Sequence, residues 1–72
     1  MTTDQLRTAL RELNGERDLE VIFAGPQQMN AMHVRNAMLI PDEQDHLVKV
    51  TDGRSVFILD ADRVAWIRIG LK

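Results

Sequence analysis

The chain has 72 residues, no Cys, and 11 acidic against 9 basic residues, which gives a net charge of −2. This length predicts one domain, 1–72, and a domain of this size buries only about 60% of the surface of its unfolded chain. The lack of Cys excludes disulfides and thiolate metal sites, so self-association is the leading remaining source of stability. The negative charge provides no general attraction to nucleic acid or to anionic membranes.

The hydropathy pattern contains no apolar run long enough to span a bilayer, and no basic segment followed by an apolar stretch marks a leader. We therefore expect a soluble protein of the cytoplasm with no membrane partner. Two His without neighbouring Cys form a poor set of metal ligands. We expect no metal and no cofactor.

The first predicted element is a helix over residues 2–14, within an N-terminal segment 1–15. Thr2 and Gln5 have the spacing of a capping box, and Gly15 is placed to end the helix in a left-handed conformation. One apolar stripe follows the helical period and has to dock on the rest of the protein: Leu6, Ala9, Leu10 and Leu13. Three basic residues alternate with acidic ones and are expected on a solvated outer face: Arg7, Arg11 and Arg17.

Two strands are predicted next. Residues 19–24 read as a short strand with three apolar side chains on one face: Leu19, Val21 and Phe23. Residues 25–28 break it, because the Pro among them has no N–H for a ladder. Residues 29–40 allow a helix or a strand, and the alternation of apolar residues favours a long, bulged strand. The alternation slips by one residue at Arg35-Asn36, which is typical of a bulge.

The clearest signal is a hairpin over residues 47–59, preceded by a loop at 41–45. Asp52-Gly53 lies between two apolar runs and favours a two-residue type I′ turn. This turn sets the pairing: Thr51 with Arg54, Val50 with Ser55, Lys49 with Val56, Val48 with Phe57 and Leu47 with Ile58. A short polar link, 60–63, leads to a last β-branched and aromatic strand over 64–69.

Both faces of these strands are apolar. With a period of two, one face carries Val48, Val50, Phe57 and Leu59, and the other carries Leu47, Val56 and Ile58. In the last strand, Val64 and Trp66 oppose Ala65, Ile67 and Ile69. A half-exposed antiparallel sheet should alternate between apolar and polar residues. We therefore expect a helix, a second sheet layer or another subunit to cover the second face.

The order of elements predicts a mainly β fold. One N-terminal helix is followed by five short antiparallel strands over residues 19–69. Five strongly bent strands close most simply into a small barrel, and the helix would then cap one opening.

The segment from Ile58 to Ile67, which reads ILDADRVAWI, resembles the second motif of the Sm-like family of small barrels, which share the Src-homology-3-like architecture. That motif has an apolar strand, a short turn of the type Arg/Lys-Gly-Asp, and a second apolar strand. Here Asp60 stands in the place of the basic residue and Ala61 in the place of Gly. Asp62 stands in the acidic place, and Val64 and Ile67 stand in the apolar places. The rest of the chain agrees with the family in the order and length of its elements.

The resemblance implies a closed homo-oligomeric ring, in which the fourth strand of one copy pairs with the fifth strand of the next. Strands 54–59 and 64–69 would form this contact, with six expected interface residues: Val56, Ile58, Val64, Trp66, Ile67 and Ile69. Apolar edge strands of this composition would otherwise invite aggregation. The alternative is that the helix covers the second face and the protein is a monomer or a dimer.

The resemblance also implies RNA binding, and the expected contacts are His33, Arg35, Asn36 and Arg63. The loops at 41–45 and 60–63 carry five acidic residues, which repel phosphates. The acidic loops favour the alternative function, an oligomeric scaffold that binds protein and no nucleic acid. Phe23, Phe57 and Trp66 are expected in the core or an interface.

Catalysis has little support in the sequence. Asp42 with His46, or His33 with a carboxylate, could form an acid–base pair. No nucleophile elbow, Gly-rich phosphate loop or paired-His metal motif accompanies them. We expect a protein that is not an enzyme.

Overall fold

The computed structural model describes residues 1–25 and 30–71, and it contains one helix followed by five antiparallel strands. The elements are α1 (Thr3–Leu10), β1 (Arg17–Phe23), β2 (Asn30–Leu39), β3 (Val48–Thr51), β4 (Val56–Leu59), a 3₁₀ turn η1 (Ala61–Arg63) and β5 (Val64–Ile69). The predicted mainly β fold with an N-terminal helix is confirmed. Of the predicted break at 25–28, only Gly25 is described, and Met29 and Lys72 also lie outside the described residues.

Helix α1 begins where the capping box predicts. The Thr2 side chain accepts from the Gln5 N–H at 3.0 Å, and the Gln5 side chain accepts from the Thr2 N–H at 3.0 Å. The helix ends at Leu10, earlier than predicted, and the next turn tightens through a bond from the Leu13 N–H to the Leu10 carbonyl. The apolar stripe still reaches the core, because Leu6, Leu10 and Leu13 are all buried.

Gly15 has the predicted left-handed conformation, with φ of +83°. It follows the end of the helix by several residues, so its role is in the connection to β1 and not in the helix cap that we expected. Its N–H donates to the Ala37 carbonyl at 3.0 Å, which ties this connection to β2.

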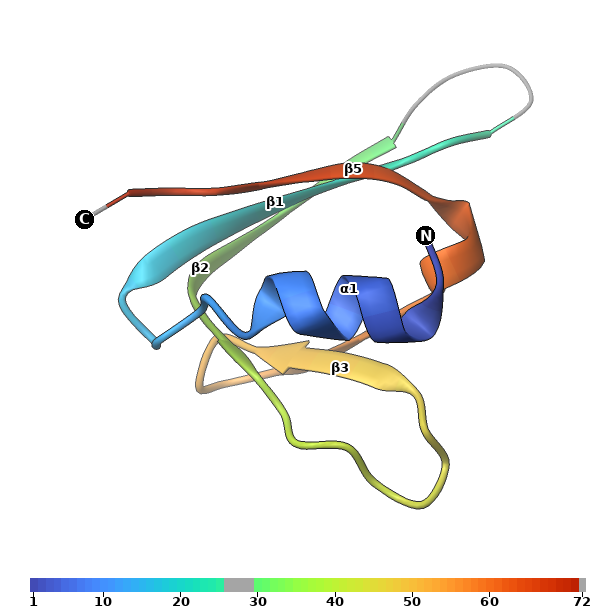
Figure 1. The fold of residues 1–72 in the computed structure, drawn as a ribbon. Coiled ribbons are helices and arrows are strands. Elements are labelled where there is room, and N and C mark those ends of the chain that lie inside the picture. Colours follow the sequence, from blue (N-terminus) through green and yellow to red (C-terminus); the bar gives the residue numbers. More distant parts are fainter. Residues whose placement is uncertain (26–29, 72) are drawn as a thin grey trace.

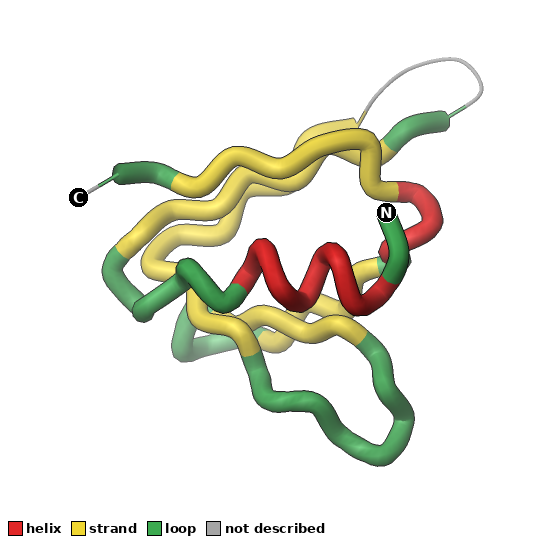
Figure 2. The backbone as a smooth tube through the Cα atoms, in the orientation of Figure 1, coloured by secondary structure: helices red, strands yellow, loops and turns green. Residues whose placement is uncertain are grey.

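The five strands form one open sheet in the order β4-β3-β2-β1-β5. The sheet bends so strongly that β1 and β5 lie above helix α1 and β3 lies below it (Figures 1 and 2). The core fills this bend and joins the helix to both halves of the sheet: Leu6, Leu10, Leu19, Val21, Val34, Val48 and Val50. Within the described residues no ladder joins β4 to β5. Closure of one chain into the barrel that we predicted is therefore not observed.

The bulge in β2 lies where the sequence predicts it. Leu19 pairs with Val34 and Arg17 pairs with Ala37, so one residue of β1 faces two residues of β2. Asn36 adopts a left-handed φ of +49°, and its N–H donates to the Asp18 carboxylate at 3.1 Å. The bulge lets β2 take part in both halves of the bent sheet.

The register predicted for the β3–β4 hairpin is wrong by two residues. Thr51 pairs with Val56, so residues 52–55 form a four-residue loop. Gly53 has φ of +91°, but Asp52 does not have the positive φ that a type I′ turn requires. The Asp52 side chain instead accepts from the N–H groups of Arg54 and Ser55, each at 2.8 Å, and these bonds lower its pKa. A shift of two residues leaves each side chain on its predicted face.

The faces predicted for β5 are wrong at its first residue. Phe23 pairs with Val64 and Ile22 pairs with Trp66, so Ala65 is an extra residue in a bulge. The bulge turns Val64 into the core, while Trp66 remains exposed. The sheet thus has an inner face, toward helix α1 and the core, and an outer face on the opposite side.

Among the described residues, no helix is long and apolar enough to cross a membrane.

Candidate functional site

The six expected interface residues fall into two groups. Val56 and Ile58 on β4 and Trp66 on β5 are exposed by 57%, 60% and 45%. Val64 is buried, and Ile67 and Ile69 are partly buried against the core. Strands β4 and β5 are the two edges of the sheet. The predicted interface therefore combines exposed side chains with the backbones of both edge strands.

On β4, the backbone groups of Val56 and Ile58 point away from the sheet. The Ile40 N–H donates to the Lys49 carbonyl at 2.9 Å, so Lys49 makes its backbone bonds with the β2 side. Successive residues of a strand bond to opposite neighbours, so the residues on either side of Lys49 bond to β4. Ile58 lies opposite Lys49 and Val56 lies opposite Thr51, so their backbone groups have no ladder partner in the part of the chain that the structure describes.

On β5, the backbone groups of Ile67 and Ile69 point away from the sheet. The Gly70 N–H donates to the Asp18 carbonyl at 2.9 Å, so Gly70 bonds toward β1. By the same alternation, the backbone groups of Ile69 and Ile67 point outward. The free backbone groups thus belong to residues with outer-face side chains on β4, and to residues with inner-face side chains on β5.

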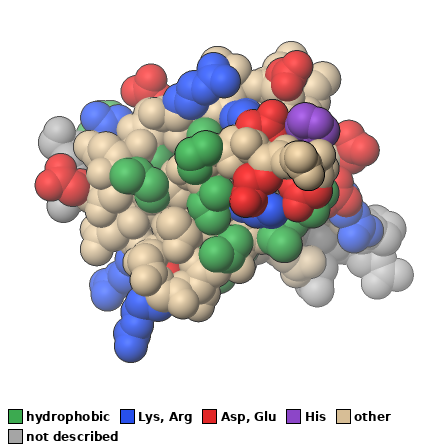
Figure 3. Space-filling model, turned by 90° about the horizontal axis from the view of Figure 1, so that it is seen from below, with side chains coloured by type: hydrophobic (Ala, Val, Ile, Leu, Met, Phe, Trp, Pro, Cys, Tyr) green, Lys and Arg blue, Asp and Glu red, His purple; other side chains and the backbone are tan. Residues whose placement is uncertain are grey.

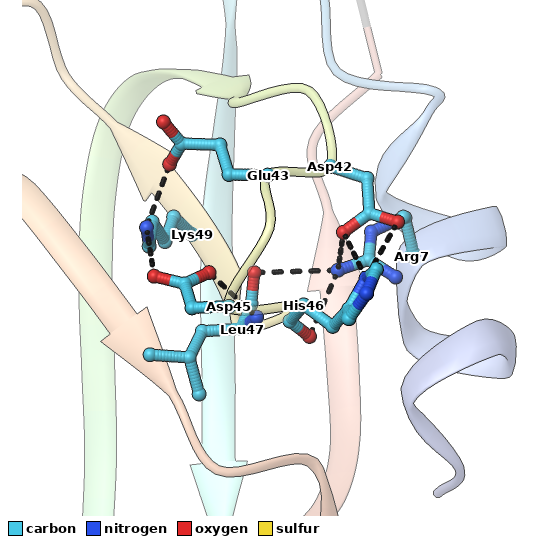
Figure 4. A network of polar contacts seen from close by, with 7 residues as sticks. All are labelled: Arg7, Asp42, Glu43, Asp45, His46, Leu47 and Lys49. Carbon is cyan, nitrogen blue, oxygen red and sulfur yellow. Dashed lines mark hydrogen bonds and ion pairs between the residues drawn. The ribbon is translucent and has the colours of Figure 1, made fainter.

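A polar network joins the connection between β2 and β3 to α1 and to β3 (Figure 4). Arg7 extends from α1, and its Nη2 donates to the carbonyls of His46 at 3.3 Å and Leu47 at 3.2 Å. The same atom lies 3.2 Å from the Asp42 carboxylate, which also contacts His46 Nδ1 at 3.3 Å. The prediction that Arg7 lies on a solvated face is wrong, because Arg7 is only 7% exposed. Its role is to anchor the loop.

Lys49 forms the other half of this network (Figure 4). Its Nζ lies 2.6 Å from Glu43 and 2.7 Å from Asp45. The hydrogen bond to Asp45 raises the pKa of Lys49, and the hydrogen bond from Lys49 lowers the pKa of Asp45. Three of the five acidic residues that we counted against phosphate binding are therefore paired with cations within the chain.

Three of the four expected RNA contacts lie on β2, and the fourth, Arg63, lies apart from them. His33 and Arg35 are exposed near the middle of β2, and Asn36 sits in the bulge beside Asp18 at the start of β1. The carbonyl of Arg63 accepts from the Ala24 N–H, beyond the other end of β1. With about 3.3 Å per residue, Asn36 and Arg63 are roughly 20 Å apart along β1.

A cluster that the sequence analysis did not identify lies across three strands. Glu20 on β1 contacts Arg68 on β5 at 2.6 Å and His33 on β2 at 2.9 Å. Its carboxylate is mostly covered, whereas Arg68 and His33 are two-thirds exposed. A pocket of about 530 Å³ lies beside the cluster. The three positions are remote in sequence, and only the β2-β1-β5 register aligns them.

A second pocket, of about 270 Å³, lies where α1, β3, β4 and η1 meet. Its apolar lining comes from both strands and the turn: Leu47, Val48, Ile58, Leu59 and Ala61. Thr3, His46, Asp60 and Asp62 complete the lining. The face seen from below in Figure 3 shows hydrophobic side chains beside a group of acidic ones.

Within residues 1–25 and 30–71, no three His, Asp or Glu side chains converge to hold a metal ion. No family model, curated protein or solved structure matches this chain.

Proposed function

We propose that the protein is a non-enzymatic homo-oligomer in which β4 of one copy pairs head-to-tail with β5 of the next, as in the Sm-like family that residues 58–67 resemble. The observation that carries the proposal is the position of the free backbone groups at the two ends of one sheet. Val56 and Ile58 present them on β4, and Ile67 and Ile69 present them on β5.

The side chains of the residues that carry these outward backbone groups lie on the faces that a head-to-tail ladder requires. In such a ladder every copy has its strands in the same order from β4 to β5. For β4 to run antiparallel to the partner's β5, the next copy must therefore be rotated by half a turn about an axis that lies in the sheet and crosses the strands. The outer face of β4 then adjoins the inner face of the partner's β5. Residues directly opposite each other in an antiparallel ladder carry side chains on the same side. Val56 and Ile58 have side chains on the outer face of β4, and Ile67 and Ile69 have side chains on the inner face of β5. After the rotation these side chains lie on the same side of the ladder, as opposite residues must.

The register that uses the outward backbone groups of both strands pairs Val56 with Ile69 and Ile58 with Ile67. The exposed side chains of β4 then pack beside two aliphatic side chains that are already partly buried. A heterologous contact of this kind forms a ring when its rotation closes. The proposed function is assembly, with the ring as a scaffold for other proteins.

The pairing is tested by disulfide cross-linking, because the chain has no Cys of its own. Oxidation of an equal mixture of Ile58→Cys and Ile67→Cys proteins should give a covalent dimer, because opposite residues of a ladder lie within disulfide distance. Each variant alone should remain uncross-linked. Cross-linking in a mixture of Val56→Cys and Ile58→Cys proteins, but not in the first mixture, would replace the proposal with a two-fold β4–β4 dimer.

RNA binding is a second candidate function, and the observation that favours it is a group of exposed basic side chains on the outer face. His33 and Arg35 lie two residues apart on β2, and Arg68 lies across Glu20 from His33. The acidic residues of the 41–45 loop are paired with Arg7 or Lys49, which reduces their repulsion of phosphates.

If this face binds single-stranded RNA, affinity should fall steeply with salt, and Arg35→Ala should reduce the salt dependence by about one phosphate contact. Arg63→Ala is the matched control, because Arg63 lies at the far end of β1. Fluorescence anisotropy of a labelled oligonucleotide measures both. Binding that neither substitution changes would exclude this surface, and a loss in Arg63→Ala alone would move the site to η1.

A further inference from the structure

Trp66 is the only Trp in the chain, and it is nearly half exposed on an edge strand. Its partner across the β1–β5 ladder is Ile22, so it lies on the outer face, beside the free edge of β5. A large aromatic side chain gains most when such exposed area is covered, and Trp is enriched among the residues that dominate interface energies. A partner that binds this surface has to cover the Trp66 indole next to the edge of β5.

The 270 Å³ pocket lies at the end of the other free edge. Leu59, the last residue of β4, forms part of its lining, and Thr3 of α1 faces the same space. Ile58 also lines the pocket from the outer face, so the pocket lies at the end of β4 and is bounded on its helix side by Leu59 and Thr3. Sites for drug-sized ligands are typically about 300–1,000 Å³, so this pocket suits one large side chain better than a separate ligand.

The proposed ladder brings the two features together. In the register that pairs Ile58 with Ile67, Leu59 lies opposite Trp66 of the next copy. Because the next copy is rotated by half a turn, its outer face lies on the same side of the ladder as the helix α1 of the first copy. Leu59 and Thr3 line the pocket from this side, so this register brings the indole of Trp66 beside the pocket.

Charges around the pocket are complementary to the same segment. Asp60 and Asp62 line it, and the Asp60 side chain accepts from the Asp62 N–H at 3.1 Å. Arg63 precedes Trp66 by three residues in the chain, so a copy that places Trp66 in the pocket also brings this cation near the two carboxylates. Opposite charges at this position fix the register and orientation of the contact more than they add affinity.

We propose that Trp66 of one copy is the anchor of the assembly and fills the pocket between Leu47, Leu59 and Ala61 of the next copy, with its Arg63 against Asp60 and Asp62. This inference rests on the proposed head-to-tail pairing. It adds the side chain that determines the affinity and the cavity that receives it.

The test uses Trp66 fluorescence in mixed oligomers. One chain carries Trp66→Phe and Asp4→Cys with a nitroxide attached, so that it quenches but does not emit. Asp4 neighbours Thr3 without lining the pocket. The other chain is the wild type, and its Trp66 is the only emitter. Trp66 in the pocket of a labelled neighbour should lose emission, because contact with the nitroxide quenches it.

The matched control attaches the nitroxide to Glu12→Cys in the same Trp66→Phe chain. Glu12 follows the other end of α1, about 12 Å farther along the helix axis, and should leave the emission unchanged. Native mass spectrometry of the same samples reports assembly. Mixed oligomers with equal emission at both label positions would overturn the Trp66 inference and leave the pairing intact. Monomers would overturn both.

Discussion

Replacing Ile58 with Lys is expected to convert the proposed oligomer into a folded monomer. In the single chain the Ile58 side chain is 60% exposed, so a Lys there meets solvent and the fold keeps its core. In the proposed ladder the same side chain lies beside the partner's Ile67, where a charge would be desolvated without a counter-charge. Sedimentation velocity measures the loss of the larger species, and circular dichroism checks that the monomer is folded.

Met38→Lys is the control for this substitution. Met38 is also an exposed apolar residue on a strand, at 46%, but β2 lies inside the sheet and not at its edge. The control should assemble like the wild type. Dissociation of both variants would indicate an apolar face as the interface in place of the β4 edge, and assembly of both would contradict the edge-pairing proposal.

Replacing Arg7 with Met is expected to destabilise the protein by about 1–3 kcal/mol, because the carbonyls of His46 and Leu47 and the Asp42 carboxylate lose their shared donor. In a domain whose total stability is about 5–15 kcal/mol, this is a large share. Urea unfolding, followed by circular dichroism, gives the change in the free energy of unfolding. A change below about 0.5 kcal/mol would show that Arg7 does not anchor the loop.

Arg11→Met is the matched control, because Arg11 lies one turn beyond Arg7 and is exposed. It should change stability by no more than about 0.5 kcal/mol, as expected for a surface position. Arg7→Lys should fall between the two. A single ammonium on a flexible stem keeps the charge near Asp42 but cannot reproduce the fork of the guanidinium.

The sequence was sufficient where the determining contacts are local. The Thr2–Gln5 capping box, the bulge at 35–36 and the extent of β5 all depend on residues within a few positions of one another. Alternation also assigned the inner and outer faces of β3 and β4, because a period of two survives a register error of two residues. The apolar surface at Val56 and Ile58 was therefore visible in the sequence.

Only the tertiary structure decided the features that join distant segments. Arg7 looked like a surface residue because its partners, Asp42 and the carbonyls of 46 and 47, are more than thirty positions away. The Glu20 cluster and the inward turn of Val64 depend on how β1 aligns with its two neighbours. A helical or strand period specifies which side of an element is apolar, but not which other element meets it. That choice is made when the core packs, and it left β4 and β5 as the edges of the sheet.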